Sequence, residues 1–282
     1  MAITEHRVTV GSLDWFFRQG QPTRPQEQAP PVVLLHGLVS QSYGWMPLLT
    51  ALEAQGYRAL APDWIGCGLS DKPERWEFSY RPEALAQALH EWLAALEIER
   101  FSLVVQGFLG SVGLRYALEH PDSIERLVIL NTPMTSAVRL PWSIRQLGIP
   151  LVGDMLTQDP LLVDRTLETG GIYRVKDRDL DVYRRPFLTT SASGRALLAT
   201  VQHLQLPQQL PAIAAAFRES TIPTLIAWGM QDPWLPFDQL SSLTNRKRLK
   251  VVSLEQVGHY PQHDWPEKVI EAVIPFLGQL VV

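Results

Sequence analysis

The chain is poor in cysteine, in long apolar runs and in net charge, and each shortage excludes a class of protein. Cys67 is the only cysteine among 282 residues, so an intramolecular disulfide is excluded and a reducing compartment is expected. No apolar segment approaches the roughly 20 residues of a membrane span, and the first residues show no apolar secretory core. A formal net charge of −4 provides no basic footprint for nucleic acid. We therefore expect a cytoplasmic protein that has no membrane span and binds no nucleic acid.

Short apolar runs alternate with helical patterns along most of the chain. A hairpin is predicted over 7–10 and 13–18 around Gly11-Ser12. Buried strands are predicted over 32–35, 57–62, 101–106, 126–131, 223–229 and 249–254. Helices are predicted over 45–55, 82–96, the segment ending at His120, 237–244 and 266–280.

The rhythm changes between Thr132 and about Ser220, where no buried strand is evident. Helical patterns over 160–168, 193–204 and 210–219 occupy this region instead. Alternating strands and helices, interrupted once, predict a doubly wound, mostly parallel sheet. We expect residues 1–133 and 221–282 to form its α/β core, and residues 134–220 to form a helical cap inserted after the sixth strand.

Polar residues and glycines follow most of the predicted strands. Open α/β sheets bind their ligands at the carboxyl ends of the strands, so these residues define the candidate site. They are His36-Gly37-Leu38, Asp63, Gly107-Phe108, Asn131, Asp232 and His259.

Several motifs together resemble the α/β-hydrolase superfamily, in the family order of elbow, acid and histidine. They are Leu34-Leu35-His36-Gly37 with Trp45 downstream, Asp63-x-x-Gly66-x-Gly68-x-Ser70-Asp71, Gly229-Met230-Gln231-Asp232-Pro233 and Val257-Gly258-His259-Tyr260-Pro261-Gln262. The capped haloalkane dehalogenases and epoxide hydrolases are the most similar branch, through Ala61-Pro62-Asp63, Ser70-Asp71-Lys72-Pro73 and Leu103-Val104-Val105-Gln106. The resemblance implies an α/β-hydrolase fold over nearly the whole chain.

The resemblance also implies roles for single residues. His259 matches the general base, and Asp232 matches the acid that orients it. The backbone amides of Leu38 and Phe108 match the oxyanion hole. The alternative for His259 is a loop histidine that caps carbonyl groups, and for Asp232 a simple Asp-Pro turn. His36 is expected to shape its loop beside the pocket.

Gly107 stands where the resemblance places the nucleophile, on the sharp strand-to-helix turn. The related dehalogenases carry Asp there, followed by Trp, whereas this chain has Gly107 and Phe108. They also use an Asn to hold halide where this chain has Leu38. Dehalogenation is therefore disfavoured at two points. An engineered knockout at residue 107 is one explanation, but Leu109, at a position where the family has a small residue, favours a natural site without a nucleophile.

No other residue is a strong substitute nucleophile. Ser111 lies about one helical turn beyond Gly107 and is expected to face helix packing, and nothing near Cys67 marks it for a lowered pKa. His259 and His263 lack the Glu of a His-Glu-x-x-His motif, so no metal is expected. No cofactor is expected either.

The expected ligand is a small apolar molecule held under the cap. Cap residues Trp142, Tyr173 and Phe187, with His36 and Asn131 from the core, are candidates for the pocket lining. The predicted function is catalysis by a non-covalent His259–Asp232 acid–base dyad with a backbone oxyanion hole. A catalytically silent small-molecule-binding protein of the same fold is the alternative, and a structural or partner-binding protein is a third reading.

Overall fold

A computed structural model describes residues 3–26, 29–159, 161–241, 243 and 247–279. Its centre is an eight-stranded sheet with the order β1-β2-β4-β3-β5-β6-β7-β8. The strands are β1 (Thr4–Val10), β2 (Leu13–Gly20), β3 (Val32–Leu35), β4 (Ala59–Pro62), β5 (Phe101–Gln106), β6 (Ile124–Leu130), β7 (Thr224–Gly229) and β8 (Leu249–Leu254). β1 and β2 pair antiparallel at one edge, and β4, β3, β5, β6, β7 and β8 run parallel. The predicted doubly wound, mostly parallel sheet is confirmed.

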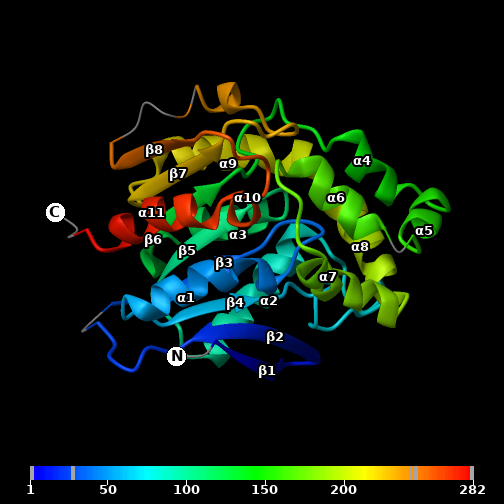
Figure 1. The fold of residues 1–282 in the computed structure, drawn as a ribbon, viewed down its shortest axis with the longest axis horizontal. Helices are drawn as coiled ribbons and strands as arrows, with labels where there is room; N and C mark the ends of the chain where they lie inside the picture. Colours follow the sequence, from blue (N-terminus) through cyan, green and yellow to red (C-terminus); the bar gives the residue numbers. More distant parts are fainter. Residues whose placement is uncertain (1–2, 27–28, 160, 242, 244–246, 280–282) are drawn as a thin grey trace.

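Alternate side chains of the central strands enter two separate cores, because successive strand residues point to opposite faces. Leu34 of β3 and Val104 of β5 face the helices α1 (Met46–Ala54) and α11 (Pro266–Leu277). Leu35 and Val105, one residue further along each strand, belong to the larger core on the other face. Figure 1 shows α1 and α11 lying together in front of the sheet. Burial on both faces explains why these strands are continuously apolar.

The opposite face of the sheet is covered by α2 (Pro82–Ala95), α3 (Gly110–Glu119) and α9 (Leu206–Glu219). Pro82 begins α2 at a position where its missing N–H costs no hydrogen bond. α3 follows β5 after a three-residue turn and is buried through Val112, Leu114 and Ala117. This turn places the candidate elbow at the carboxyl end of the most central strand.

Helices fill the chain between β6 and β7, as the sequence predicts, and we keep the word cap for α4 to α8. They are α4 (Trp142–Arg145), α5 (Val152–Leu156), α6 (Leu162–Gly170), α7 (Asp177–Thr189) and α8 (Ala192–His203). Figure 1 shows them gathered at one end of the sheet. α9 packs against α3 of the core, and the boundaries of the cap at 134 and 220 stay a prediction.

Some predicted elements differ in length or kind. The helix expected over 45–55 is present as α1, and a 3₁₀ turn that was not predicted, η1 (Ser42–Trp45), precedes it. The helix expected over 237–244 is a 3₁₀ turn, η4 (Phe237–Leu240), and residues 242 and 244 lie outside the described chain. The strand expected from Tyr57 begins at Ala59. α7, which contains Pro186, was not predicted.

Four short helices complete the description: η2 (Pro121–Ser123), η3 (Gln146–Gly148), α10 (Pro261–Asp264) and the 3₁₀ turn η4. α10 carries the residues that follow His259 and leads directly into α11. Over the described residues, every helix is too short or too polar to cross a membrane.

Candidate functional site

Gly107 occupies the apex of the turn between β5 and α3 with a left-handed φ of 69°. A Cβ atom built on it would lie 3.2 Å from His259 Nε2 and 3.2 Å from the Cα of Gly37. The missing side chain would therefore point at the imidazole. Glycine adopts this backbone without the strain that an L-residue carries there, so the elbow keeps its direction while it presents no reactive group.

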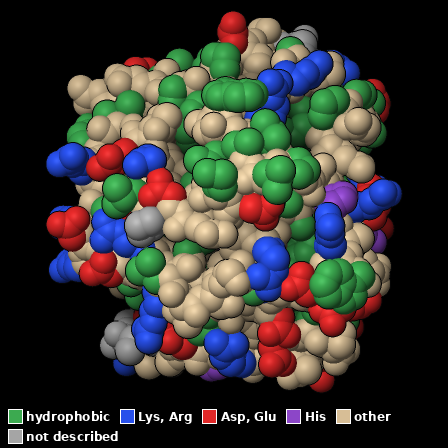
Figure 2. All heavy atoms as spheres, turned by 90° about the vertical axis from the view of Figure 1, so that its right-hand side faces the viewer, with side chains coloured by type: hydrophobic (Ala, Val, Ile, Leu, Met, Phe, Trp, Pro, Cys, Tyr) green, Lys and Arg blue, Asp and Glu red, His purple; other side chains and the backbone are tan. Residues whose placement is uncertain are grey.

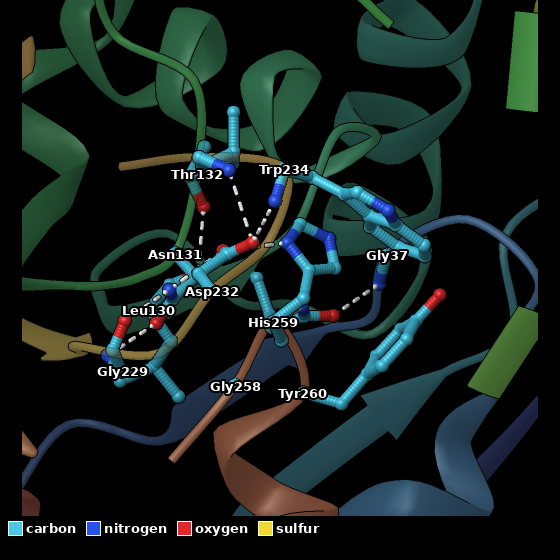
Figure 3. Close-up of polar contacts among 12 residues, drawn as sticks. Gly37, Leu130, Asn131, Thr132, Gly229, Asp232, Trp234, Gly258, His259 and Tyr260 are labelled. Atoms are coloured by element: carbon cyan, nitrogen blue, oxygen red, sulfur yellow. Dashed lines mark hydrogen bonds and ion pairs between the residues drawn. The ribbon is translucent and has the colours of Figure 1, made fainter. Parts of the chain in front are cut away.

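His259 and Asp232 form a buried pair beside the elbow. His259 Nδ1 lies 2.8 Å from Asp232 Oδ2, and the two side chains are 1% and 0% exposed. Because a carboxylate accepts only, Nδ1 carries the proton and Nε2 is left as the acceptor of the neutral ring. Figure 3 shows the two side chains pointing toward each other at the ends of their loops. Nε2 faces the space in front of Gly107.

Asp232 accepts four hydrogen bonds, which hold its carboxylate in one orientation. Oδ1 receives the backbone N–H groups of Trp234 at 2.8 Å and Leu235 at 3.0 Å. Oδ2 receives Asn131 Nδ2 at 2.7 Å in addition to His259. Donors on both oxygens leave this buried side chain one orientation. The turn after β7 is thus built around the Asp232 carboxylate.

Asn131 ties the end of β6 to the end of β7. Its Oδ1 accepts the Gly229 N–H at 2.8 Å, and its Nδ2 donates to Gly229 O at 3.2 Å and to Asp232. The residue has a positive φ of 39°, a conformation that Asn tolerates better than most residues. Asn131 was predicted to line the pocket, and the structure places its side chain on the acid. Its amide is a support for Asp232.

Gln106, the last residue of β5, links the two loops that flank the elbow. Its Nε2 donates to the carbonyl of His259 at 2.7 Å, and its Oε1 accepts the Gly37 N–H at 3.2 Å. The side chain is completely buried. One amide therefore sets the distance between the histidine loop and the loop that carries Leu38.

Three aromatic rings enclose the imidazole of His259. Phe108 is stacked on it at 5.1 Å between ring centroids, Trp234 lies at 4.7 Å, and Tyr260 meets it edge-on at 5.0 Å. Figure 3 shows the Trp234 and Tyr260 rings together on one side of the imidazole. The Tyr260 hydroxyl donates to Leu38 O at 3.2 Å. This apolar shell lowers the local polarity, which strengthens the hydrogen bonds inside it.

Two buried backbone N–H groups flank the elbow, one from each neighbouring loop. Leu38 and Phe108 are 2% and 1% exposed. Neither N–H donates a hydrogen bond within the part of the chain that the structure describes. Unengaged buried donors are rare because each costs free energy. An oxyanion hole requires unengaged donors of this kind beside the elbow, and that role for Leu38 and Phe108 stays a prediction.

The cap is bonded directly to the histidine loop. The His259 N–H donates to Gly170 O at the end of α6 at 2.7 Å. Asp264 Oδ2 accepts the Gly258 N–H at 2.6 Å, and Oδ1 accepts Ile172 at 2.9 Å and Tyr173 at 3.2 Å. Burial, its largest influence, raises the pKa of Asp264 above its ordinary value. Asp264 was not predicted from the sequence. The one signal that could have indicated it is its place shortly after the His259 motif.

His36 supports its loop and does not face the dyad. Its Nδ1 lies 2.8 Å from Gly37 O, and its Nε2 accepts the Trp64 N–H at 3.1 Å. Burial lowers the pKa of this imidazole, so it is neutral at pH 7. Asp63 holds the glycine loop by accepting the N–H groups of Ser42 at 2.6 Å and Leu69 at 2.7 Å. Both residues are occupied in building the site.

The two substitute nucleophiles are placed away from this chemistry. The Ser111 hydroxyl donates to Phe108 O at 2.8 Å and accepts from Gln209 of α9 at 3.3 Å. Burial raises the pKa of the Cys67 thiol to about 12, so the reactive thiolate is absent at neutral pH. Within the described residues, no three His, Cys, Asp or Glu side chains come together as a metal site requires.

The cap aromatics predicted for the pocket are placed less centrally. Trp142 is 60% exposed and stacks with the Arg145 guanidinium, and Tyr173 is 45% exposed beside Trp265. Phe187 is half-buried against the larger core. None of the three has a ring contact with His259 among the described residues. Their role as pocket lining stays a prediction.

The chain matches known proteins over most of its length. Residues 30–266 match the family model described as the alpha/beta hydrolase fold. A cis-3-alkyl-4-alkyloxetan-2-one decarboxylase of Shewanella oneidensis is 31% identical over 271 residues, which cover 89% of this chain and 83% of that protein. Haloalkane dehalogenase 2 of Mycobacterium tuberculosis is 27% identical over 265 residues, or 88% of each.

Solved structures give the same result. The crystal structure of a haloalkane dehalogenase from Bradyrhizobium elkani superposes with a TM-score of 0.85 at 25% identity, covering 98% of each chain. An epoxide hydrolase structure superposes with a TM-score of 0.77 over 98% of each chain at 21% identity, which supports the fold alone. The chain therefore belongs to the α/β-hydrolase fold family, in the capped branch that includes the haloalkane dehalogenases.

Proposed function

We propose that this protein hydrolyses a small apolar ester, linear or cyclic, by direct attack of water that His259 activates. The observation that supports this most is the position of the missing Gly107 side chain. A Cβ built there would lie 3.2 Å from His259 Nε2, so the space in front of Gly107 faces the imidazole. A water molecule in that space would be within hydrogen-bond reach of Nε2. It would stand where a side-chain nucleophile is held in other members of the fold.

The reaction follows from the hydrogen bonds around that space. Neutral His259 accepts a proton from water at Nε2 while the water oxygen bonds to the ester carbonyl carbon. Asp232 stabilises the imidazolium that forms, and the N–H groups of Leu38 and Phe108 bind the oxyanion. When the intermediate collapses, the imidazolium returns its proton to the leaving alkoxide. The products are an acid and an alcohol, and His259 is neutral again.

Two observations suggest the class of substrate: the aromatic rings around His259 and the name of one similar protein. The aromatic shell of Phe108, Trp234 and Tyr260 favours an apolar molecule. The Shewanella relative is named for an oxetan-2-one, a four-membered cyclic ester that bears two alkyl chains. We therefore place alkyl-substituted oxetan-2-ones beside activated linear esters in the first substrate panel, with epoxides, haloalkanes and substrates that have acidic C–H bonds.

The test compares the wild type with His259→Ala and with His120→Ala, an exposed histidine on the far end of α3 as matched control. General-base catalysis is supported if turnover falls by at least about a hundredfold in His259→Ala and is unchanged in His120→Ala. Turnover that is equal in all three proteins contradicts it. If no substrate turns over, native mass spectrometry that detects a stoichiometric apolar ligand favours the silent binding protein instead.

A second measurement tests the absence of a covalent intermediate. The intact mass of the protein is recorded during turnover of the most responsive substrate. An unmodified mass supports direct attack by water. A trapped acyl or alkyl adduct on Ser111 or Cys67 contradicts the mechanism, since it would supply the nucleophile that residue 107 does not.

A further inference from the structure

The cap exposes a group of apolar side chains that its own packing does not use. Five of them, called here the cap patch, lie within 14 residues of sequence: Trp142, Ile149, Leu151, Val152 and Met155. Leu151 is 78% exposed, Met155 75% and Trp142 60%. Figure 2 shows the end of the molecule that carries the cap, with hydrophobic side chains grouped on it and charged side chains of both signs around them. Clustered exposure of this kind marks an interaction surface.

Backbone strain holds one member of the cap patch in solvent. Leu151 has a φ of 65°, in the left-handed region that a leucine adopts at a cost. It precedes α5, and its N–H is capped by Asp154 Oδ2 at 3.1 Å. Packing does not require this conformation, because the side chain it directs outward contacts mostly water. The strained backbone therefore directs an apolar side chain to the surface.

The exposed charged residues of the segment 139–155, which carries the cap patch, are Arg139, Arg145 and Asp154, so the segment has a net positive charge. No Asp or Glu occurs between Glu125 and Asp154, and the charged residues beside the patch in that interval are Arg139 and Arg145. Both are exposed, and neither forms an ion pair with a described acid: Arg139 donates to the carbonyls of Ser136 and Val138, and Arg145 lies 5.0 Å from the Trp142 ring centroid. Asp154, the first acid of the segment, is engaged at the start of α5.

We propose that the cap patch docks on an anionic lipid surface. Protruding Trp, Leu and Met side chains enter the boundary between headgroups and acyl chains, while Arg139 and Arg145 meet the negative headgroups. A second copy of this chain fits less well. A two-fold contact through the patch would bring together two surfaces of the same net positive charge. The proposal does not depend on the chemistry at His259.

Vesicle co-sedimentation tests the proposal with the full chain. Vesicles of phosphatidylcholine alone are compared with vesicles that contain phosphatidylglycerol, for the wild type and for Leu151→Gly, Leu151→Ser/Met155→Ser and Arg139→Ser/Arg145→Ser. Leu188→Ser is the control, because Leu188 is a 64% exposed leucine of α7 outside the patch. We expect wild type and control to bind the anionic vesicles, and the three patch variants to bind about tenfold more weakly or less.

Leu151→Gly also separates docking from folding. Glycine relieves the left-handed strain at this position, so its Tm should equal or exceed that of the wild type while its lipid binding falls. Equal binding of the wild type to neutral and anionic vesicles overturns the proposal, as does a loss in Leu188→Ser that matches the patch variants. Self-association that the patch variants abolish, without vesicle binding, overturns it in favour of a second copy.

Discussion

Substitution of Gly107 by alanine tests whether the elbow is held rigidly against His259. An L-residue in the left-handed region costs about 1–2 kcal/mol, and alanine recovers about 0.4–1 kcal/mol by restricting the unfolded chain. These two effects leave about 0.5–1 kcal/mol of destabilisation from the backbone. The new methyl group would also lie 3.2 Å from the Gly37 Cα and 3.2 Å from His259 Nε2, and such overpacking costs about 1–3 kcal/mol. We expect a total loss of about 1.5–4 kcal/mol.

Gly11→Ala is the matched control for the backbone part. Gly11 has a φ of 60° in the β1–β2 turn, and a Cβ there would meet no atom within 4 Å. Its substitution should cost about 0.5–1 kcal/mol. Urea unfolding followed by circular dichroism measures both variants, and each kcal/mol should lower the Tm by about 2–4 °C. If Gly107→Ala costs no more than Gly11→Ala, the site relaxes freely and the argument for a preorganised space fails.

The same variant bears on the proposed water. The methyl group occupies the approach to His259 Nε2, so turnover of the responsive substrate should fall by about 10² or more. A Gly107→Ala enzyme that retains wild-type turnover would refute attack by a water held in front of the elbow. The stability measurement is unaffected by that outcome, so the two conclusions are separable.

Three further predictions concern groups outside the reacting space. Burial lowers the pKa of His263 to about 4 from 6.5, so the stability that the neutral imidazole contributes is present above about pH 6.5 and is lost as the pH falls toward 4. The free energy of unfolding, measured from pH 7 to 4, should therefore fall with pH in the wild type and fall less in His263→Gln. The raised pKa of the Cys67 thiol predicts that iodoacetamide at pH 8 modifies the native protein far more slowly than the unfolded one, and equal rates by mass spectrometry would contradict this. Asp264→Ala removes the acceptor shared by Gly258 and Ile172, so hydrogen exchange at both amides should accelerate, whereas unchanged protection would show that other contacts hold the cap to the histidine loop.

The fold was predictable because its signals are local. Apolar runs such as Val32–Leu35 and Phe101–Gln106 mark strands that are buried on both faces, and a Pro near the start or a Gly after the end bounds the helices. His259 and Asp232 could be placed at one edge of the sheet because the carboxyl ends of parallel strands meet there, and the family resemblance implied that they pair. The structure brings these two side chains to 2.8 Å of each other.

The remaining parts depend on contacts between distant segments. α7 contains Pro186, which disfavours a helix interior, and it is stabilised by packing through Leu180 and Tyr183. Asn131 acts on Asp232, which is 101 residues away, and its amide orientation follows from a backbone of positive φ that no periodicity reveals. Trp142 belongs to a short surface helix, and apolar character alone did not show which side it faces.

Buried polar groups surround a position that has no nucleophile, and this supports our proposal of a working site. Asp232 is a buried carboxylate with four donors, and Gln106 is a buried amide that bonds two loops. Replacement of such groups by apolar residues of similar size is often neutral or stabilising, so the stability of the fold does not by itself require them. The buried N–H groups of Leu38 and Phe108 have no described hydrogen-bond partner, which destabilises the folded state. A region with only a structural role would not need the buried hydrogen-bonding groups that surround Gly107.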